Sequence, residues 1–559
     1  MRRLRQWTML SKLGGLALVL RPDSPPGAEF KGTFLGKHVM VTTDPSTTTV
    51  AQLRAHLSHF NLSWTLRRIG ELSAAADGHS FIEVAAVPVA SHSLPYLAVV
   101  AIEVSTDDVP TVPTLADVAE AARIYNSLIE PDFTADRADT RVFEYLIRLG
   151  YSQFAGRVDL RNLIARTWIL YHLLWPKTEQ ASTFDIVAAI GTETGLDLRQ
   201  LMMFGFAYSG HSKPGYMTPY NDDALAMLPI GLRAGPQEQA RFLAWVTASF
   251  AEVRQIGAAS LPHEDYDKYR LSPFLVKPVV RPDNPPTPGG DSIRLVPIPR
   301  YLARRVTDGL YHALATANDQ GGGTNPFRVA FGSVFEQYVG NLLHAGSGPT
   351  NVRAEWEYGR KGLRRRTPDW LVLDGNRLLV VEVKQSALKL NTKMLGRLDL
   401  LAADLERTLG EGARQLLKFC EDLSAALPGL EGLEEVREIE LLLVTHDEVP
   451  WANWLMRDTI AKRVPGAGQI HFCSIDDFEN LQRYCWGGSI FDLLSQKRHG
   501  PDHAHERDFR EWLYQRGAPT TPNHPVLAQA FEELVASWGA TPRQLLANSG
   551  PKALPAGVP

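Results

Sequence analysis

The chain contains few of the residues that would tie it to an oxidising compartment. Among its 559 residues there are only three cysteines, Cys420, Cys473 and Cys485, far apart and odd in number. Neither a disulfide framework nor the ligand spacing of a zinc site follows from them. We therefore expect a protein of the reducing cytoplasm.

Long apolar runs are also missing. No stretch of about 18 or more apolar residues occurs, so the sequence predicts no membrane-spanning helix. Near the amino terminus, Arg2, Arg3 and Arg5 precede a short apolar run at residues 13–20, which imitates a signal peptide. The residues that follow lack a clear small-x-small cleavage site, so we expect no secretion.

Several catalytic signatures are absent. The chain has no G-x-x-x-x-G-K-[ST] loop and therefore supplies no P-loop motor of its own. It also has no G-x-S-x-G elbow and no H-E-x-x-H helix. The formal net charge is -4, so any contact with nucleic acid must be local rather than spread over the whole surface.

The length exceeds what one hydrophobic core normally fills, so several domains are expected. The clearest boundary is the proline-dense segment around residues 278–291, which we predict to be a linker with no regular structure. The predicted organisation is a mixed α/β domain at 1–108, a mainly helical domain at 109–277, a linker at 278–292, a nuclease-like domain at 293–498, and a helical extension with a tail at 499–559.

The two regions before the linker differ in texture. The first carries three runs with a strand-like composition, HVMVTT, FIEVAAV and YLAVVAIEV. The second is dominated by helix-like segments such as NLIARTWILYHLLW and EQARFLAWVTASFAEV. We expect the aromatic residues of these segments to lie in the core rather than to form a stacking platform: Trp168, Tyr171, Trp175 and Trp245.

The most informative segment, residues 367–385, reads TPDWLVLDGNRLLVVEVKQ. Two apolar runs, at 370–373 and 378–381, flank Asp374-Gly375-Asn376, and this pattern predicts a tight β-hairpin. If Gly375-Asn376 is the loop, Asp369 lies opposite Glu382. If the loop is Asp374-Gly375, Asp369 lies diagonal to Glu382. Because side chains alternate along a strand, either register puts Asp369 on the face shared by Glu382 and Lys384.

Such a group of charges predicts a divalent metal site. Two neighbouring carboxylates repel each other unless a cation or a proton lies between them. Oxygen ligands of this kind suit Mg²⁺ or Mn²⁺, and the Val383 carbonyl is a candidate for a further oxygen. An ammonium at Lys384 can orient a water and offset charge on a phosphate, which points to hydrolysis of phosphodiester bonds.

The sequence Pro368-Asp369, followed after a spacer by Glu382-Val383-Lys384, resembles the PD-(D/E)xK nuclease superfamily over about residues 327–478. The resemblance implies a restriction-endonuclease-like αβββαβ core within a multidomain α/β protein, preceded by a mixed β region and a mainly helical region. It also implies that Asp369 and Glu382 are metal ligands and Lys384 the catalytic lysine.

The expected elements of this core follow one another along the chain. They are a helix that includes FGSVFEQYVGNLL, a strand at about 352–358, the hairpin, a helix at about 412–423 and a buried strand at 439–445. The resemblance further suggests Glu336 on the first helix and Gln415 on the second as members of the site. From the residues alone, Glu336 is equally compatible with a solvated helix position, and Gln415 is more typical of an ordinary helix-forming residue.

Basic residues surround the hairpin, and a charge run of this kind is either a solvated face or a track for phosphates. We favour a phosphate track formed by Arg364, Arg365, Arg366 and Lys389.

The sequence thus predicts a cytoplasmic, Mg²⁺-dependent nuclease. By analogy with the family, DNA is favoured over RNA, and the role is an endonuclease in antiviral defence or in DNA repair. Three alternatives remain open: a non-catalytic nucleic-acid-binding or assembly subunit, a nuclease active only with a partner ATPase or sensor, and an exposed hairpin whose three charges form only an ion-pair cluster. The amino-terminal half is assigned, by elimination, to choosing a substrate or a protein partner.

Overall fold

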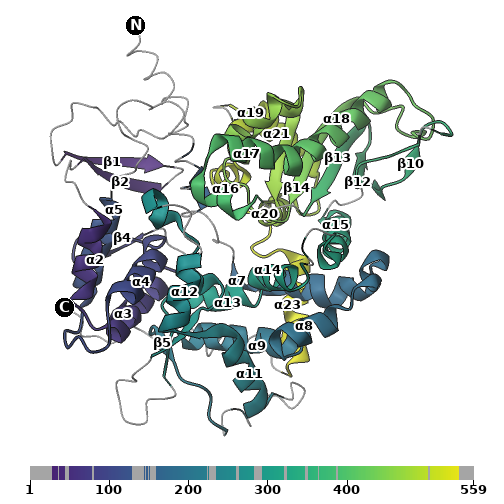
Figure 1. Ribbon diagram of the computed structural model, residues 1–559. Helices are drawn as coiled ribbons and strands as arrows, with labels where there is room; N and C mark the ends of the chain where they lie inside the picture. The colour runs from purple at the N-terminus through teal and green to yellow at the C-terminus, as the bar shows by residue number, and fades with distance from the viewer. Residues whose placement is uncertain are drawn as a thin grey trace. The chain divides into compact units, whose positions relative to one another are not determined.

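A computed structural model of the chain describes residues 28–34, 37–43, 49–77, 81–128, 144, 147–148, 150–151, 159–222, 225, 234–259, 264–282, 293–319, 321, 324–346, 351–362, 364–385, 388–501 and 504–539. These residues form a mixed α/β protein with two compact units (Figure 1). Each unit is assembled from segments that are separated in the sequence. The sheet unit comprises Met1–Thr48, Ile129–Gly156 and Phe331–His524, and the helical unit comprises Thr49–Leu128, Arg157–Ala330 and Pro525–Pro559.

The sheet unit is built on a five-stranded sheet in the order β15-β14-β13-β12-β9. The strands β9, β12 and β13 pair antiparallel, whereas β13, β14 and β15 run parallel. The strands of this unit are β1 (Ala28–Phe34), β2 (Lys37–Thr43), β9 (Asn351–Ala354), β10 (Glu357–Tyr358), β11 (Arg365–Arg366), β12 (Trp370–Asp374), β13 (Arg377–Lys384), β14 (Glu438–Thr445) and β15 (Ile470–Ser474). Its helices are α15 (Pro326–Gly346), α16 (Leu390–Leu395), α17 (Leu398–Leu405), α18 (Glu411–Ser424), α19 (Arg457–Ala461), α20 (Ile475–Cys485), α21 (Ile490–His499) and α22 (Phe509–Tyr514).

The central strands are covered on both faces, which explains why they are almost entirely apolar. One face of the sheet presents Leu378, Val380 and Leu443 to a core that includes Leu416 and Phe419 of α18. On α15, Phe331, Phe335, Tyr338 and Leu342 are fully buried. The predicted succession of helix, strand, hairpin, helix and strand is therefore present at the expected positions, with the first strand split into β9 and β10.

The contact between α15 and β12 is unusually close. A Cβ atom built on Gly340 would lie 2.0 Å from the indole ring of Trp370. The same indole donates its N–H to the carbonyl oxygen of Glu336 at 3.1 Å. A glycine at this position lets the helix rest directly on the tryptophan, and the tryptophan in turn fixes the helix turn that carries Glu336.

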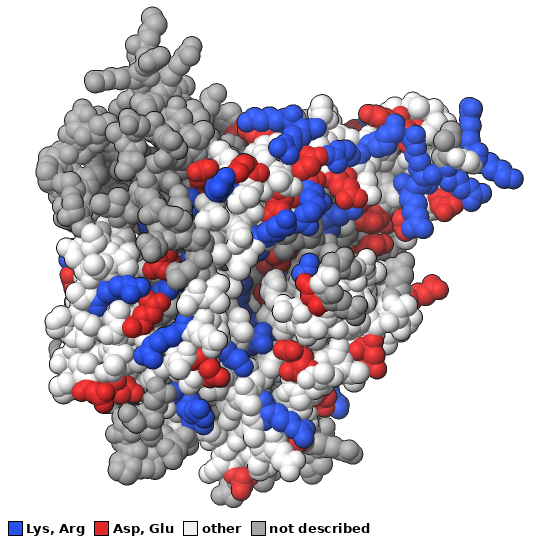
Figure 2. Space-filling view, viewed as in Figure 1, with Lys and Arg blue, Asp and Glu red and all other residues white. Residues whose placement is uncertain are grey.

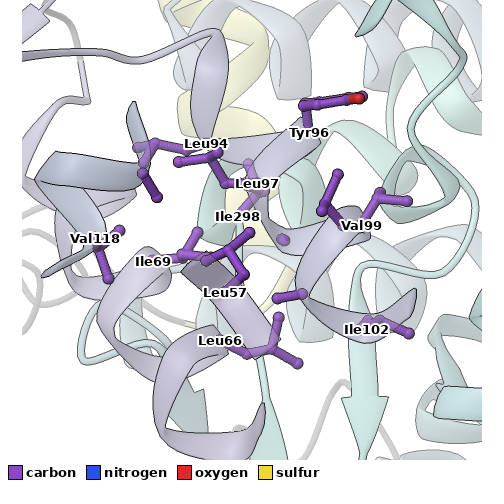
Figure 3. Packing of buried hydrophobic residues seen from close by; sticks show 14 of the residues in the cluster. Leu57, Leu66, Ile69, Leu94, Tyr96, Leu97, Val99, Ile102, Val118 and Ile298 are labelled. Atoms are coloured by element: carbon purple, nitrogen blue, oxygen red, sulfur yellow. The ribbon is translucent and has the colours of Figure 1, made fainter. Parts of the chain in front are cut away.

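The helical unit has its own core, formed mainly by α2 to α5 (Figure 3). Its elements are α2 (Val50–Ser58), α3 (Leu62–Ala75), β3 (Phe81–Val84), β4 (Val87–Ala90), α4 (Ser93–Val104), α5 (Leu115–Asn126), α7 (Leu160–Trp168), α8 (Ile186–Thr194), α9 (Leu198–His211), β5 (Tyr216–Met217), α11 (Pro236–Val246), β6 (Thr247–Ser249), α12 (Phe250–Ala259), β7 (Val279–Arg281), β8 (Arg294–Leu295), α13 (Pro299–Arg305), α14 (Asp308–Ala317) and α23 (Pro525–Ser537). Four of these strands form a sheet in the order β5-β8-β7-β6. The expectation that Trp168, Tyr171, Trp175 and Trp245 lie in the core is confirmed, since all four are buried.

Two predictions for this unit are wrong. The run YLAVVAIEV belongs to the helix α4 and not to a strand. Helix α4 is buried along nearly its whole length, and a run that is apolar on every side shows no periodicity that distinguishes helix from strand. The predicted linker also begins too early, because Val279–Arg281 forms β7 and pairs with both β6 and β8.

Other predictions fall outside the described residues. These include the signal-like run at 13–20 and the proline-dense residues 283–292. No helix among the described residues is long and apolar enough to cross a membrane. All three cysteines are unpaired thiols.

The close contact of α15 with β12 leads to a prediction about stability. Gly340→Ala should lower the free energy of unfolding by about 1–3 kcal/mol, because its methyl group must displace the Trp370 ring. Gly332→Ala on the same helix is the matched control, since a Cβ there meets only the Gln385 amide at an ordinary 3.4 Å. Urea unfolding of both variants measures the difference. Equal stability of the two variants would show that the tryptophan moves away without cost.

Candidate active site at the end of the hairpin

The hairpin has the first of the two predicted registers. Trp370 pairs with Val381 and Asp374 with Arg377, so Gly375 and Asn376 form a two-residue loop. Gly375 has a φ of 63°, a conformation that glycine adopts without strain. Continuing the register by one residue beyond Trp370 places Asp369 opposite Glu382, as this loop predicts.

Asp369 lies just before β12, and its carboxylate accepts a hydrogen bond from the backbone of β13. Its Oδ2 atom accepts a hydrogen bond of 2.7 Å from the N–H of Val383. The last residue pair between the two strands is Trp370 with Val381, so the carboxylate continues the hydrogen bonding after the strand pairing has ended. Asp369 is therefore held in place by the backbone of the segment that carries Glu382 and Lys384.

Glu382 and Lys384 share the face of β13 that packs toward α18. Glu382 is only 2% exposed, and its Oε1 atom lies 2.7 Å from the Lys384 Nζ atom. A Cβ atom on Gly412, the second residue of α18, would lie 3.4 Å from Glu382 Cγ and 3.2 Å from Lys384 Cε. The helix thus rests on the aliphatic part of both side chains and fixes their direction.

The electrostatics of the group favour a bound cation. Burial raises the pKa of Asp369 to about 6, against the opposing effects of the Val383 N–H and Lys384. Burial, followed by repulsion from Asp369, raises the pKa of Glu382 to about 8. Burial lowers the pKa of Lys384, but the neighbouring Glu382 and Asp369 outweigh it and leave that pKa above its usual value. One ammonium therefore faces more negative charge than it can neutralise when the carboxyl groups ionise.

Glu336, on α15, interacts electrostatically with this group. Burial raises the pKa of its carboxyl group to about 8, and the charge of Asp369 adds to the increase. Gln415, in contrast, is exposed on α18, and no hydrogen bond joins it to the carboxylates. The structure thus brings Asp369, Glu382 and Lys384 together and places Glu336 near enough to affect the pKa of Glu382, whereas the role predicted for Gln415 gains no support from its position.

Two residues near the site escaped the sequence analysis. Gly412 has no chemical group to mark it, and only the close approach of α18 reveals its role. Gln385 follows Lys384 directly, and its Oε1 atom is buried without a hydrogen-bond partner. The sequence shows that Gln385 follows the E-x-K segment, but it does not show that the Gln385 amide packs against α15.

A complete set of acidic metal ligands is not assembled. Among the described residues, no group of three or more histidine, cysteine, aspartate or glutamate side chains is arranged to hold a metal ion. Two opposed carboxylates with several waters are nevertheless enough for Mg²⁺, which often takes only one or two protein carboxylates. The donor set therefore fits this ion, while the role of the Val383 carbonyl remains a prediction.

The basic residues around the hairpin are interleaved with acidic ones. Figure 2 shows Lys and Arg side chains gathered over the part of the sheet unit that carries β10, with Asp and Glu between them. Three of them form ion pairs, with these distances between side-chain nitrogen and carboxylate oxygen: Arg364 with Glu357 at 3.0 Å, Arg366 with Glu355 at 2.9 Å, and Lys389 with Asp404 at 4.0 Å. These three side chains are largely exposed, and exposed ion pairs are weak enough to be exchanged for phosphates.

Arg365 differs from its two neighbours. It forms an ion pair with Asp422, a buried carboxylate that also accepts a hydrogen bond of 2.9 Å from the Tyr358 hydroxyl. Arg365 therefore compensates the charge of the buried Asp422. This ion pair competes with the phosphate contact that the sequence predicts for Arg365.

Comparison of the chain with family models, with curated proteins and with solved structures finds no match. The interpretation of the site therefore rests on its residues and their geometry.

The raised pKa of Glu336 predicts a dependence of stability on pH. A carboxyl group whose pKa rises from 4.5 to about 8 on folding favours the folded state at low pH, and this contribution is lost as the pH rises toward 8. In chelator, Glu336→Gln should therefore be more stable than the wild type at pH 8, by on the order of 1–2 kcal/mol after allowance for solvent screening. At pH 4 the difference should vanish.

Urea unfolding at the two pH values measures this effect, with the exposed Glu435→Gln as a control that should follow the wild type. A Glu336→Gln variant that is less stable than the wild type at pH 8 would show that the carboxylate is stabilised rather than strained by its surroundings.

Proposed function

We propose that this protein is a metal-dependent nuclease that hydrolyses phosphodiester bonds at the group Asp369, Glu382 and Lys384. The observation that carries the proposal is the convergence of a buried carboxylate, Glu382, a half-buried one, Asp369, and one amine at the end of the hairpin. Charges in such apolar surroundings are costly unless they are compensated or used. Their similarity to the PD-(D/E)xK pattern adds the reaction class by analogy.

The proposed ion is Mg²⁺ or Mn²⁺. Asp369 and Glu382 would hold it, since they come from adjoining strands and carry more negative charge than Lys384 neutralises. When bound, the ion would supply Lewis-acid charge that offsets the negative charge developing on the phosphate.

Lys384 and Glu336 have different tasks in the proposed reaction. The Lys384 side chain is 23% exposed, so its ammonium can turn from Glu382 toward a phosphate and orient the attacking water. Glu336 has a pKa raised to about 8, which suits a group that accepts or releases a proton near neutral pH. The Val383 N–H keeps Asp369 in place.

The substrate is proposed to be nucleic acid, with DNA ahead of RNA by analogy alone. Arg364, Arg366 and Lys389 are exposed beside the hairpin and offer a phosphate track. Defence against foreign DNA and DNA repair are the roles that the same analogy suggests, and a protein partner would bind through the amino-terminal half.

A second candidate function is a non-catalytic nucleic-acid-binding or assembly subunit. It is favoured by the lack, within the described part of the chain, of a third acidic metal ligand. It is also favoured by the closed ion pair between Lys384 and Glu382. A direct cleavage assay separates the two functions.

The proposed function predicts that single substitutions abolish cleavage. Asp369→Asn and Lys384→Ala should each lower the rate of plasmid or single-strand cleavage about 10²–10³-fold or more, because each removes a charge that acts on the transition state. Chelation of the metal should have the same effect, and added Mg²⁺ should restore the wild type only. The assay compares supercoiled DNA, single-stranded DNA and RNA.

Asp399→Asn serves as the matched control, because this aspartate is exposed and lies outside the group. Its cleavage rate should equal that of the wild type. Metal-dependent cleavage that survives Asp369→Asn in folded protein would place the reaction elsewhere. A complete lack of cleavage by the wild type on all three substrates would favour the non-catalytic function.

The phosphate track predicts a change in salt dependence. The double variant Arg364→Gln, Arg366→Gln should bind nucleic acid more weakly, and its plot of log K against log salt should be shallower by about 2 on duplex DNA. Arg437→Gln, an exposed arginine that donates only to backbone carbonyls, should leave the slope unchanged. Fluorescence anisotropy over a range of salt concentrations measures both. Identical slopes for all three proteins would remove Arg364 and Arg366 from the interface.

A further inference from the structure

A small polar pocket lies in the sheet unit, away from the hairpin group. It has a volume of about 120 Å³ and is lined by residues that include Arg457, Arg498, His471 and His505. His471 is the second residue of β15 and so lies near the start of that strand. Lys384 pairs with Thr445 of β14, and Thr445 pairs with Ser474, the last residue of β15. The pocket is therefore at the opposite end of these parallel strands from Lys384.

One of the lining residues is a buried cation without a carboxylate partner. The Arg457 side chain is almost inaccessible, with 7% of the residue exposed, and its Nη1 atom donates to the His505 carbonyl oxygen at 3.1 Å. No carboxylate lies within ion-pair distance of Arg457 among the residues that the structure describes. Burial lowers the pKa of this guanidinium, against the opposing charges of Asp458 and Glu506.

A second buried cation, Lys497, bonds to the backbone of a residue that lines the pocket. Lys497 is fully buried, and its Nζ atom donates to the carbonyl oxygens of Ala504 and His505 at 3.0 and 3.2 Å. Burial lowers its pKa to about 7. Within the described part of the chain it too has no ion-pair partner, so its charge adds to the positive potential of the pocket when it is protonated.

Glu440, the carboxylate that bonds to two of the lining residues, is already occupied. Glu440 accepts hydrogen bonds from Nε and Nη2 of Arg498 and is joined to His471 Nε2 at 3.1 Å. Arg498 Nη2 also donates to the Gln469 carbonyl oxygen. These bonds hold the guanidinium plane rigid, and they leave Arg498 Nη1 without a bond to any described residue. Arg457 therefore supplies the excess positive charge.

We propose that this pocket binds a phosphate-like oxyanion, carried either by inorganic phosphate or by a phosphomonoester. Guanidinium groups bind tetrahedral oxyanions through charge-assisted hydrogen bonds, and such an anion would compensate the buried charge of Arg457. The cavity is small beside the roughly 300–1,000 Å³ of pockets that hold drug-sized ligands, so it accepts one phosphate group and leaves a larger substituent outside. The proposal does not depend on nuclease activity.

Isothermal titration of the full-length protein with sodium phosphate tests the proposal. The titration is run in chelator, so that the hairpin group holds no metal, and it is compared with sodium chloride at equal ionic strength. Saturable binding of phosphate but not of chloride is expected. Ribose 5-phosphate forms a second arm: tighter binding than inorganic phosphate identifies a phosphomonoester as the ligand, and weaker binding identifies free phosphate.

The variant Arg457→Gln should bind phosphate at least tenfold more weakly, while Arg463→Gln, an exposed arginine shortly after α19, should bind like the wild type. If Arg457→Gln does not fold, Arg457→Lys keeps the charge but loses the planar fork and should still weaken binding. In the wild type, the His471 ring signals in an NMR titration should shift saturably with phosphate, and those of His344 should not.

A wild-type protein that binds phosphate no better than chloride would overturn the proposal. So would a folded Arg457→Gln variant with unchanged affinity, or a His471 signal that does not respond to phosphate.

Discussion

The candidate site depends on the hydrogen bond between the Asp369 carboxylate and the Val383 N–H. Strand β12 begins one residue after Asp369, so this side chain replaces a backbone partner at the point where the two strands stop pairing. The bond fixes the Asp369 carboxylate to the backbone of Val383, the residue between Glu382 and Lys384. A hairpin with an apolar residue in place of Asp369 would lose both a charge and the alignment of the group.

The surrounding fold holds the group from both sides of the sheet. On one side, α18 approaches so closely through Gly412 that the aliphatic parts of Glu382 and Lys384 have little freedom. On the other, α15 carries Glu336 and is fixed to Trp370. Glu382, Lys384 and Glu336 thus lie on a strand and a helix, and Asp369 lies one residue before β12, an arrangement that holds their side chains more accurately than loops would.

Much of the hairpin could be predicted from the sequence because alternation and turn chemistry are local properties. The turn residues Asp374-Gly375-Asn376 limit the hairpin to two registers, and the pairing of Trp370 with Val381 selects the first of them. Burial is not a local property. The helix α4 was predicted as a strand because an apolar run looks the same in both, and Val279–Arg281 was assigned to a linker although β6 and β8 supply its partners from distant segments. Gly412 and the pocket at Arg457 depend on how far-apart segments pack, which no short pattern encodes.

The packing of α15 against the Trp370 indole ring has a consequence for how any ligand could reach the carboxylates. Because Trp370 joins the start of β12 to the helix turn of Glu336, these two pieces form a single rigid block. An opening movement at this boundary would have to separate the Trp370 ring from Gly340 and break the hydrogen bond of its indole to Glu336. Access to the carboxylates therefore cannot come from separating α15 from the start of β12.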